Sequence, residues 1–257
     1  GPGGVAAKLS GIPLVLHEQN AIPGMTNKLL SLIATKVLCA FANTFEPGKA
    51  EVVGNPIRQE LITLGGQPRA QHQDALKILV VGGSLGAKVF NDLMPAVVAE
   101  VSKSQSVTVW HQVGKGNQAP VEAEYQQLGQ DGRVKVAEFI DDMEAAYRWA
   151  DVVICRAGAL TVSELAAVGL PSLLVPYPHA VDDHQTRNAQ VLVDAGAAFL
   201  LPQPIVDVPR LANKLALLGS DRNELALMGQ RARAAAVLDA TDKVAQVCIE
   251  LAEKGNR

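Results

Sequence analysis

Residues 76–90 read LKILVVGGSLGAKVF, and this stretch decides the fold. Its first part is a short, almost continuously apolar run, which is typical of a strand buried on both faces of a sheet. The glycine-rich residues 82–87 follow at once and lead into a segment of helical length. A buried strand, a tight glycine turn and a helix open a βαβ unit. The stretch therefore predicts an α/β fold with parallel strands.

The same order of strand, turn and helix repeats along the 257 residues. The apolar runs are rich in Val, Leu and Ile, and the repeat predicts right-handed βαβ units in doubly wound parallel sheets. We expect strands at residues 12–17, 37–41, 76–82, 107–113, 134–139, 152–155, 172–176 and 197–201. We expect helices at residues 88–102, 122–127, 141–149, 160–168, 185–195, 208–217, 222–237 and 241–253.

The organisation changes near Asn55. The stretch VGNPIR at 53–58 ends one unit, and the polar stretch LGGQPRAQHQD at 64–74 precedes the next strand as an expected loop. We therefore expect one domain at 1–54, a second at 55–237, and a C-terminal helix at 238–257 that packs back toward the first. The chain opens with GPGG and lacks an initial Met, which we interpret as a chain without its natural beginning.

Composition excludes several classes of protein. Hydrophobic residues make up 48% and charged residues 19%, which indicates a globular chain. The net charge of −3 offers no basic field for a nucleic acid. Cys39, Cys155 and Cys248 lie far apart in apolar runs, so buried thiols are favoured over a zinc site. No run reaches the roughly 18–20 apolar residues of a membrane span, and we recognise no signal peptide, so any membrane contact is expected to be peripheral.

The turn at 82–87 is the first candidate binding loop. Glycines let a backbone come close to a ligand, and the following helix N-terminus offers free N–H groups and a positive dipole end. Ser84 adds a hydroxyl donor. The pattern fits neither a Walker loop nor G-x-G-x-x-G. It predicts a cradle for a diphosphate, with an ordinary tight turn as the alternative.

A second loop, RAGALTVSE at 156–164, also follows an expected strand and begins a helix. The backbone amides of Ala159, Leu160 and Thr161 would point from the helix N-terminus toward an anion. Glu164 can accept hydrogen bonds from two ribose hydroxyls, because a carboxylate has two acceptor oxygens. The alternative is a capping box formed by Thr161 and Glu164.

A third segment, PYPHAVDDHQTRNA at 176–189, leaves the same edge of the expected sheet. Ligands of open α/β sheets bind at that edge. Gln185 could bind a sugar hydroxyl or a phosphate, and Asp182 or Asp183 is the expected helix N-cap. A metal cluster of these aspartates with His179 and His184 is disfavoured, because no rigid i,i+4 pair on a helix supports it.

The stretch HEQNAIPG at 17–24 lies at the carboxyl end of the first expected strand. It does not fit the zinc-protease pattern H-E-x-x-H. Polar residues at the end of a strand suit sugar hydroxyls or general-base catalysis, which makes His17 and Glu18 candidate bases. The alternative is a polar turn in which Asn20 is a local cap.

These loops together resemble the MurG family, the N-acetylglucosaminyltransferases that make lipid II of peptidoglycan. The resemblance covers essentially the whole chain in the right order. It implies the GT-B fold, in which two doubly wound parallel-sheet domains face a cleft, with the first domain incomplete here. The matching stretches are HEQNAIPG at 17–24, VGNPIR at 53–58, GGSLGA at 82–87, EFIDDM at 138–143, RAGALTVSE at 156–164 and DHQTRNA at 183–189.

The resemblance also implies roles for single residues in binding UDP-GlcNAc. It places the uracil against Phe139 and the backbone of Ile140, and the ribose hydroxyls on Glu164. Asn20 and Gln185 are implied to contact the GlcNAc hydroxyls, while relatives can carry glutamine at the position of His184, whose role is left open. The implied diphosphate contacts are Arg58, Ser84 and the amides of Leu160 and Thr161.

The implied reaction is an inverting transfer of GlcNAc from UDP-GlcNAc to the C4 hydroxyl of undecaprenyl-pyrophosphoryl-MurNAc-pentapeptide, which converts lipid I to lipid II. No metal and no cofactor are expected. The base is His17, Glu18 or a residue of the segment that the chain lacks. That segment is implied to contact the cytoplasmic face of the bacterial inner membrane peripherally.

Three rival functions stay open. Another GT-B enzyme that uses a UDP-sugar, either a glycolipid synthase or a UDP-GlcNAc 2-epimerase, would keep the donor site. A non-catalytic subunit that binds UDP-sugars would need a partner chain. A nicotinamide-dependent dehydrogenase is disfavoured, because the match of residues 1–6 to G-x-G-x-x-A has no visible strand before it.

Overall fold

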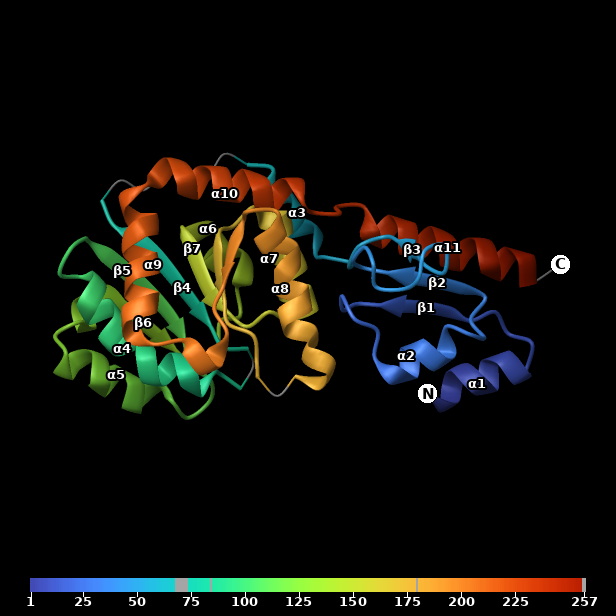
Figure 1. The fold of residues 1–257 in the computed structure, drawn as a ribbon, viewed down its shortest axis with the longest axis horizontal. Coiled ribbons are helices and arrows are strands. Elements are labelled where there is room, and N and C mark those ends of the chain that lie inside the picture. The colour runs from blue at the N-terminus through green and yellow to red at the C-terminus, as the bar shows by residue number, and fades with distance from the viewer. Residues whose placement is uncertain (68–73, 84, 179, 256–257) are drawn as a thin grey trace.

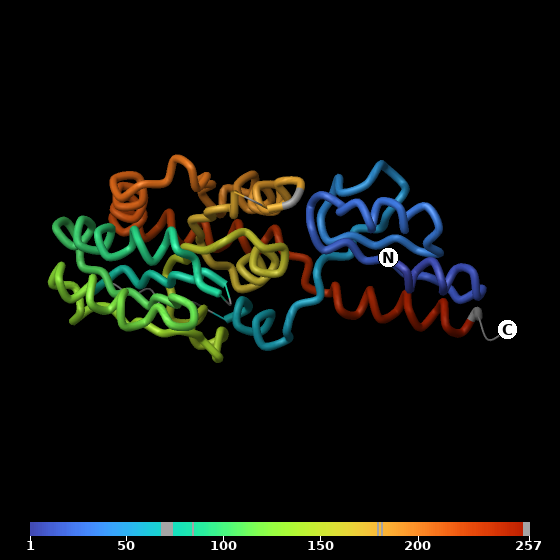
Figure 2. The backbone as a smooth tube through the Cα atoms, turned by 90° about the horizontal axis from the view of Figure 1, so that it is seen from below, coloured from blue at the N-terminus to red at the C-terminus, as the bar shows by residue number. Residues whose placement is uncertain are grey.

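The structure is a computed structural model, and it describes residues 1–67, 74–83, 85–178 and 180–255. Its described strands form a three-stranded sheet and a six-stranded sheet, both parallel. Figure 1 shows the two sheets as separate α/β units, which we refer to as the first and second domains. The chain crosses between them near residues 53–58 and again near residues 235–239, and these two segments lie side by side (Figures 1 and 2). The predicted α/β class with parallel sheets is confirmed.

The first domain has the strand order β1-β2-β3. Leu16 pairs with Val37 and Cys39 with Val52. The C-terminal helix α11 returns from the second domain and runs along this sheet (Figures 1 and 2). The elements are α1 (Pro2–Leu9), β1 (Val15–Glu18), α2 (Met25–Leu30), β2 (Lys36–Cys39), β3 (Glu51–Val52) and α11 (Ala240–Gly255).

The second domain has the strand order β6-β5-β4-β7-β8-β9. The chain builds outward from β4 in one direction and then restarts at β7 on the other side. The switch point, where ligands of open α/β sheets bind, therefore lies between β4 and β7. The strands are β4 (Leu76–Val81), β5 (Val107–Gln112), β6 (Val134–Ala137), β7 (Val152–Cys155), β8 (Ser172–Leu174) and β9 (Ala198–Leu200).

Helices cover both faces of this sheet. Ile78 and Val80 of β4 belong to one core cluster and Leu79 to the other, which explains why the strand is apolar at successive positions. Phe90 and Met94 of α4 pack in the first cluster, and Leu165 of α7 packs in the second. The α-helices are α3 (Gln59–Gly65), α4 (Lys88–Val101), α5 (Gln118–Gln127), α6 (Met143–Trp149), α7 (Ala159–Val168), α8 (His184–Asp194), α9 (Val208–Ser220) and α10 (Arg222–Ala234).

Several expected boundaries were wrong. The loop expected from residue 64 begins later, because α3 extends to Gly65 and buries Leu61 and Leu64 on its way. The expected strand at 12–17 begins only at Val15. The sequence also missed the two-residue strand β3, which forms through its pairing with β2. Tertiary contacts decided these elements where the local pattern was weak.

The expectation of three buried thiols holds for two of them. Cys39 and Cys155 are buried, but Cys248 is exposed. Cys248 lies on α11, where none of the described side chains after Ala240 is fully buried. Its apolar surroundings in the sequence reflect one stripe of an amphipathic helix, and Cys248 lies outside that stripe.

A buried histidine makes stability depend on pH. The side chain of His111 is 0% exposed, its Nδ1 lies 3.1 Å from the Tyr125 hydroxyl, and burial lowers its pKa from 6.5 to about 3. The unfolded chain therefore takes up the proton first, so stability is full above pH 6.5 and falls as the pH drops toward 3. We expect the free energy of unfolding to fall by about 2 kcal/mol between pH 6.5 and about pH 4.5 because of this group.

Urea unfolding at a series of pH values measures this loss. The variant His111→Gln removes the titrating group, and its unfolding free energy should decline less steeply over the same pH range. An equal decline in the variant would show that other groups cause the pH dependence.

Candidate functional site

The candidate loops of the second domain meet at one edge of its sheet. The loop 82–87 follows β4, residues 138–142 follow β6, residues 156–158 follow β7 and residues 175–183 follow β8. Each loop leaves the carboxyl end of a parallel strand, so all of them lie on the same side of the sheet, around the switch point. In the first domain, residues 19–24 follow β1 in the same way.

The glycines of the loop at 82–87 have different tasks. A Cβ on Gly86 would lie 2.1 Å from the carbonyl oxygen of Val113, and the φ of Gly86 is +74°. Gly83 has a φ of +88° but no described atom within 4 Å of its Cβ position. The absence of a side chain at Gly86 therefore lets the loop at 82–87 pack against the loop that follows β5. At Gly83, the space that a Cβ would occupy is open. Ser84 lies outside the described residues.

Glu164 lies on the first turns of α7. The phenolic hydroxyl of Tyr147 donates to its Oε2 at 3.1 Å, and the guanidinium of Arg58 lies 3.5 Å from its Oε1. The side chain is 21% exposed. Burial raises the pKa of Glu164, while the hydrogen bond from Tyr147 and the charge of Arg58 lower it. Tyr147 and Arg58 therefore hold one carboxylate oxygen each, and the side chain remains partly accessible to solvent.

The capping-box alternative for Glu164 is wrong. The N-cap of α7 is Gly158, so Thr161 lies three residues inside the helix and cannot cap it together with Glu164. No described side chain caps this N-terminus. The amides of Ala159, Leu160 and Thr161 have no carbonyl partner within the helix by its geometry, and Leu160 is 46% exposed. This helix end therefore offers donors to an anion.

Gln185 and His184 begin α8. The amide oxygen of Gln185 accepts hydrogen bonds from the backbone of Ala157 at 3.3 Å and of Tyr177 at 2.9 Å. Gln185 thus joins two of the loops at the sheet edge. His184 is half-buried beside it, at the start of the same helix.

Asp183 does occupy the N-cap position of α8, but it makes no capping hydrogen bond. Its backbone is left-handed, with a φ of 52°, and its carboxylate accepts from the Thr186 hydroxyl at 2.6 Å. The expected N-cap position is therefore confirmed for Asp183, whereas a capping bond from its side chain is not made. Asp182 also has a positive φ, of 54°.

Glu18 organises the loop that follows β1. It is 2% exposed, and Oε1 accepts from the backbone and side-chain nitrogens of Asn20 at 2.9 and 3.3 Å. Its Oε2 accepts from the backbone of Gly24 at 3.3 Å and from the side chain of Asn27 at 2.7 Å. Both oxygens are therefore engaged in holding the loop.

His17 differs from Glu18, because it contacts the segment between the domains. Its Nε2 lies 2.8 Å from the carbonyl oxygen of Gly54. A carbonyl only accepts, so Nε2 carries the proton and the lone pair of the neutral ring is on Nδ1. His17 can therefore hold its position and still accept a proton.

Asn20 contacts the second domain instead of capping a local helix, which corrects that alternative. Its Oδ1 accepts from the side chain of Asn188 at 3.2 Å, and the Oδ1 of Asn188 accepts from the backbone of Ala21 at 2.8 Å. Asn188 is 0% exposed and also donates to the carbonyl of Ala157 at 3.2 Å. The loop at 17–24 therefore meets the loop after β7.

Ile140 and Phe139 lie beyond the end of β6. Ile140 is 5% exposed, whereas Phe139 is 58% exposed. The carbonyl of Glu138 accepts from the side chain of Gln112 at 2.9 Å and from the backbone of Gly114 at 3.1 Å. These bonds fix the segment beside the loop that follows β5.

Sequence reasoning missed three residues that hold the site together: Asn55, Tyr147 and Asn188. Asn55 and Asn188 belong to the motifs VGNPIR and DHQTRNA, so the sequence did mark their neighbourhood. No local pattern in the sequence, however, shows that an asparagine is buried. Tyr147 lies on α6, 17 residues before Glu164, and only the packing of α6 beside α7 brings the two side chains together. A buried partner of this kind has no periodic signature.

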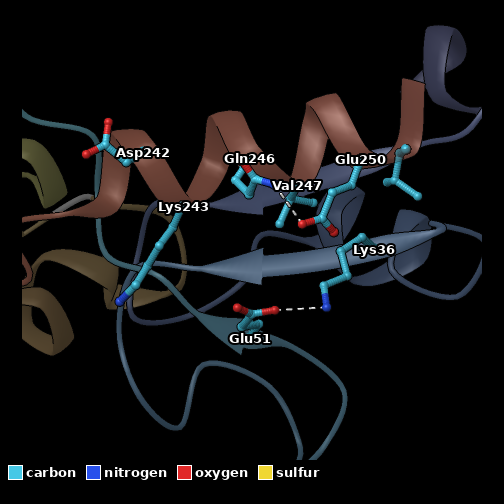
Figure 3. Close-up of a pocket in the computed structure, with 8 residues that line it drawn as sticks. Lys36, Glu51, Asp242, Lys243, Gln246, Val247 and Glu250 are labelled. Atoms are coloured by element: carbon cyan, nitrogen blue, oxygen red, sulfur yellow. Dashed lines mark hydrogen bonds and ion pairs between the residues drawn. The ribbon is translucent and has the colours of Figure 1, made fainter. Parts of the chain in front are cut away.

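A groove between α11 and the first sheet holds none of these residues (Figure 3). Its volume is about 560 Å³. Figure 3 shows the ion pair between Lys36 and Glu51, at 2.8 Å, on its floor. Charges of both signs line it, and no converging set of donors or acceptors marks it as the site. Nor do the described residues contain a group of three or more His, Cys, Asp or Glu side chains that could hold a metal.

Comparison with known proteins decides the family. Residues 77–244 match the glycosyltransferase family 28 C-terminal domain, and residues 1–39 match the glycosyltransferase family 28 N-terminal domain. The chain belongs to glycosyltransferase family 28. Among relatives within the family, it is 79% identical over 255 residues to the UDP-N-acetylglucosamine--N-acetylmuramyl-(pentapeptide) pyrophosphoryl-undecaprenol N-acetylglucosamine transferase of Shewanella oneidensis. The match covers 99% of this chain and 70% of that relative, and the same values hold for a relative from Shewanella baltica.

Solved structures agree with this family. MurG of Acinetobacter baumannii superposes with a TM-score of 0.82 and 40% identity, covering 96% of this chain and 69% of that one. A structure described as a UDP-N-acetylglucosamine 2-epimerase from Listeria monocytogenes has a TM-score of 0.68 at 15% identity, covering 98% and 71% of the two chains, which shows a shared fold alone. The expected GT-B fold and the resemblance to the MurG family are confirmed.

Proposed function

We propose that the chain transfers N-acetylglucosamine from UDP-GlcNAc to undecaprenyl-pyrophosphoryl-MurNAc-pentapeptide, converting lipid I to lipid II in peptidoglycan synthesis. The names and the 79% identity of its relatives support this reaction. In the structure the supporting observation is Glu164, a half-buried carboxylate held by Tyr147 and Arg58 beside the free N-terminus of α7. That arrangement suits ribose hydroxyls next to a diphosphate.

The donor is proposed to lie on the second domain, residues 55–237. Its uracil would contact Ile140 and its ribose would contact Glu164. The GlcNAc hydroxyls would meet Asn20 and Gln185, with His184 beside them. The diphosphate contacts would come from Arg58, Ser84 and the amides of Ala159, Leu160 and Thr161.

The transfer step places negative charge on the departing diphosphate. The C4 oxygen of the N-acetylmuramyl unit bonds to the anomeric carbon of GlcNAc from the side opposite UDP, and the bond from that carbon to the diphosphate breaks. The N-termini of α4 and α7 and the guanidinium of Arg58 would stabilise the leaving charge.

The base would accept the proton of the C4 hydroxyl. Of the two candidates in this chain, His17 keeps a lone pair on Nδ1, whereas both oxygens of Glu18 already accept hydrogen bonds from the loop. We therefore favour His17 for the proton and Glu18 for the structure of the loop.

The acceptor is proposed to bind against the first domain, residues 1–54, with residues 238–257 packed back on it. None of the described helices is both long and apolar enough to cross a membrane. Because the proposed acceptor is lipid-linked, we propose that the reaction takes place at the cytoplasmic face of the inner membrane. We propose that peripheral contact there uses a part of the longer relatives that this chain does not span.

A transfer assay tests this function. The chain would be mixed with UDP-[¹⁴C]GlcNAc and a soluble analogue of lipid I, and the labelled products separated by chromatography. We expect one labelled GlcNAc on the acceptor and UDP in equal amount. Conversion of the donor to UDP-N-acetylmannosamine without acceptor would instead indicate a 2-epimerase, and binding of donor with no product would indicate a subunit that only binds.

A further inference from the structure

Asn55 lies buried at the point where the chain passes from the first domain to the second. It is 2% exposed. Its Nδ2 donates to the carbonyl of Gln19 at 3.1 Å and to the hydroxyl of Ser163 at 3.0 Å. Gln19 belongs to the loop after β1, and Ser163 belongs to α7 beside Glu164. One amide group thus joins a loop of the first domain to a helix of the second.

The orientation of this amide follows from its partners. The Gln19 carbonyl only accepts hydrogen bonds, so the group that faces it must be the NH₂. The Oδ1 of Asn55 is then buried with no hydrogen-bond partner among the described residues. A buried acceptor without a protein partner costs free energy, and the two hydrogen bonds that Asn55 donates across the domain boundary offset this cost.

The neighbours of Asn55 in the chain tie it to both sides. The carbonyl of Gly54 accepts from His17, and the guanidinium of Arg58 lies 3.5 Å from the carboxylate of Glu164. Gly54 has a φ of +85°, and a Cβ there would lie 2.6 Å from the Cβ of Val237 in the returning segment. Residues 54–58 therefore cross tightly between the domains and contact a candidate site residue at each end.

A narrow crevice lies beside Asn55 and is lined by residues of both domains. Its volume is about 30 Å³. It is lined by Ala40, Phe41, Gly54, Asn55, Ile57, Val162, Ser163, Ala166, Val191, Ala235, Ala236 and Val237. Asn55 therefore lies where the two domains face each other.

We propose that Asn55 is a positioning residue for the donor sugar: it fixes the distance between the loop that carries Asn20 and the helix that carries Glu164. This rests on the proposed function, in which UDP-GlcNAc has its ribose on Glu164 and its GlcNAc hydroxyls on Asn20. A ligand held at two ends needs the two anchors at a fixed separation. UDP alone, which lacks the sugar, needs only the second domain.

The test compares UDP-GlcNAc with UDP in calorimetric titrations of this chain. Asn55→Ala should weaken UDP-GlcNAc binding about tenfold, and UDP binding by less than about twofold. Asn55→Asp keeps the shape but loses the donor, so it should match Asn55→Ala. Ser163→Ala removes the partner in the second domain, and the double variant should lose little more than Asn55→Ala alone.

The ratio of the two affinities separates positioning from stability. Loss of the two buried hydrogen bonds lowers the thermal midpoint in either case, so the midpoint does not decide. A merely structural role would weaken both ligands equally, and that result would exclude the proposed role. Hydrogen exchange of residues 19–24 in the unliganded chain gives a second readout, which we expect to be about tenfold faster in Asn55→Ala. Unchanged exchange there would also exclude the role. If the unsubstituted chain binds no UDP-sugar, the proposed function fails, while the exchange rates still show whether Asn55 holds the loop.

Discussion

Replacing Glu164 by alanine is expected to weaken UDP-GlcNAc binding by about 100-fold or more, because two charge-assisted hydrogen bonds to ribose are lost. The carboxylate is only 21% exposed, so water replaces those bonds poorly. The substitution also removes the acceptor of the Tyr147 hydroxyl and the charge opposite Arg58. Calorimetric titration of the folded variant with UDP-GlcNAc measures the loss.

Two further variants show whether the effect is specific. Glu164→Gln keeps the shape and one acceptor oxygen, so its loss should lie between that of alanine and the unsubstituted chain. Glu60 also pairs with Arg58, at 3.8 Å, but its side chain is 48% exposed. Glu60→Ala should therefore change the affinity by less than about twofold. Similar losses in Glu60→Ala and Glu164→Ala would contradict a ribose contact at Glu164.

Gly86→Ala is expected to lower the free energy of unfolding by about 3 kcal/mol or more. The new Cβ would lie 2.1 Å from the carbonyl oxygen of Val113, and the φ of +74° disfavours any side chain. The loop at 82–87 and the loop after β5 would have to separate. Urea unfolding followed by circular dichroism measures the change.

Gly116 provides the matched control for this substitution. Its φ is +79°, but no described atom lies within 4 Å of its Cβ position. Gly116→Ala should therefore cost about 1–2 kcal/mol, from the left-handed backbone alone. If Gly86→Ala and Gly116→Ala lowered the free energy of unfolding equally, the close contact between the two loops at Gly86 would add nothing to the cost of the substitution.

The sequence predicted the second sheet well because its central strands are buried on both faces and are therefore apolar at successive positions. In β4, Ile78 and Val80 face one core and Leu79 faces the other, so burial on both faces appears directly as an apolar run. The loops at its carboxyl edge could be located for the same reason. The helix α3 and the strand β3 carried no such pattern, and they form only where α7 and β2 offer a surface.

The contacts between candidate site residues could not be predicted in this way. Asn188 meets Asn20 across 168 positions of sequence, and Asn55 meets Ser163 across 108. Hydrophobic periodicity places helices and strands, but it gives no distance between two polar side chains on different domains. Family resemblance suggested which residues act, whereas the structure shows that Glu18 holds a loop and that Tyr147 orients Glu164.

The most direct measurement is calorimetric titration of the unsubstituted chain with UDP-GlcNAc, with UDP-glucose and NADH as competitors of different chemistry. A site built for this donor should bind UDP-GlcNAc with a Kd on the order of micromolar, bind UDP-glucose more weakly and not bind NADH. A folded chain that binds neither UDP-sugar, or that prefers NADH, would contradict a donor site at the carboxyl edge of the second sheet.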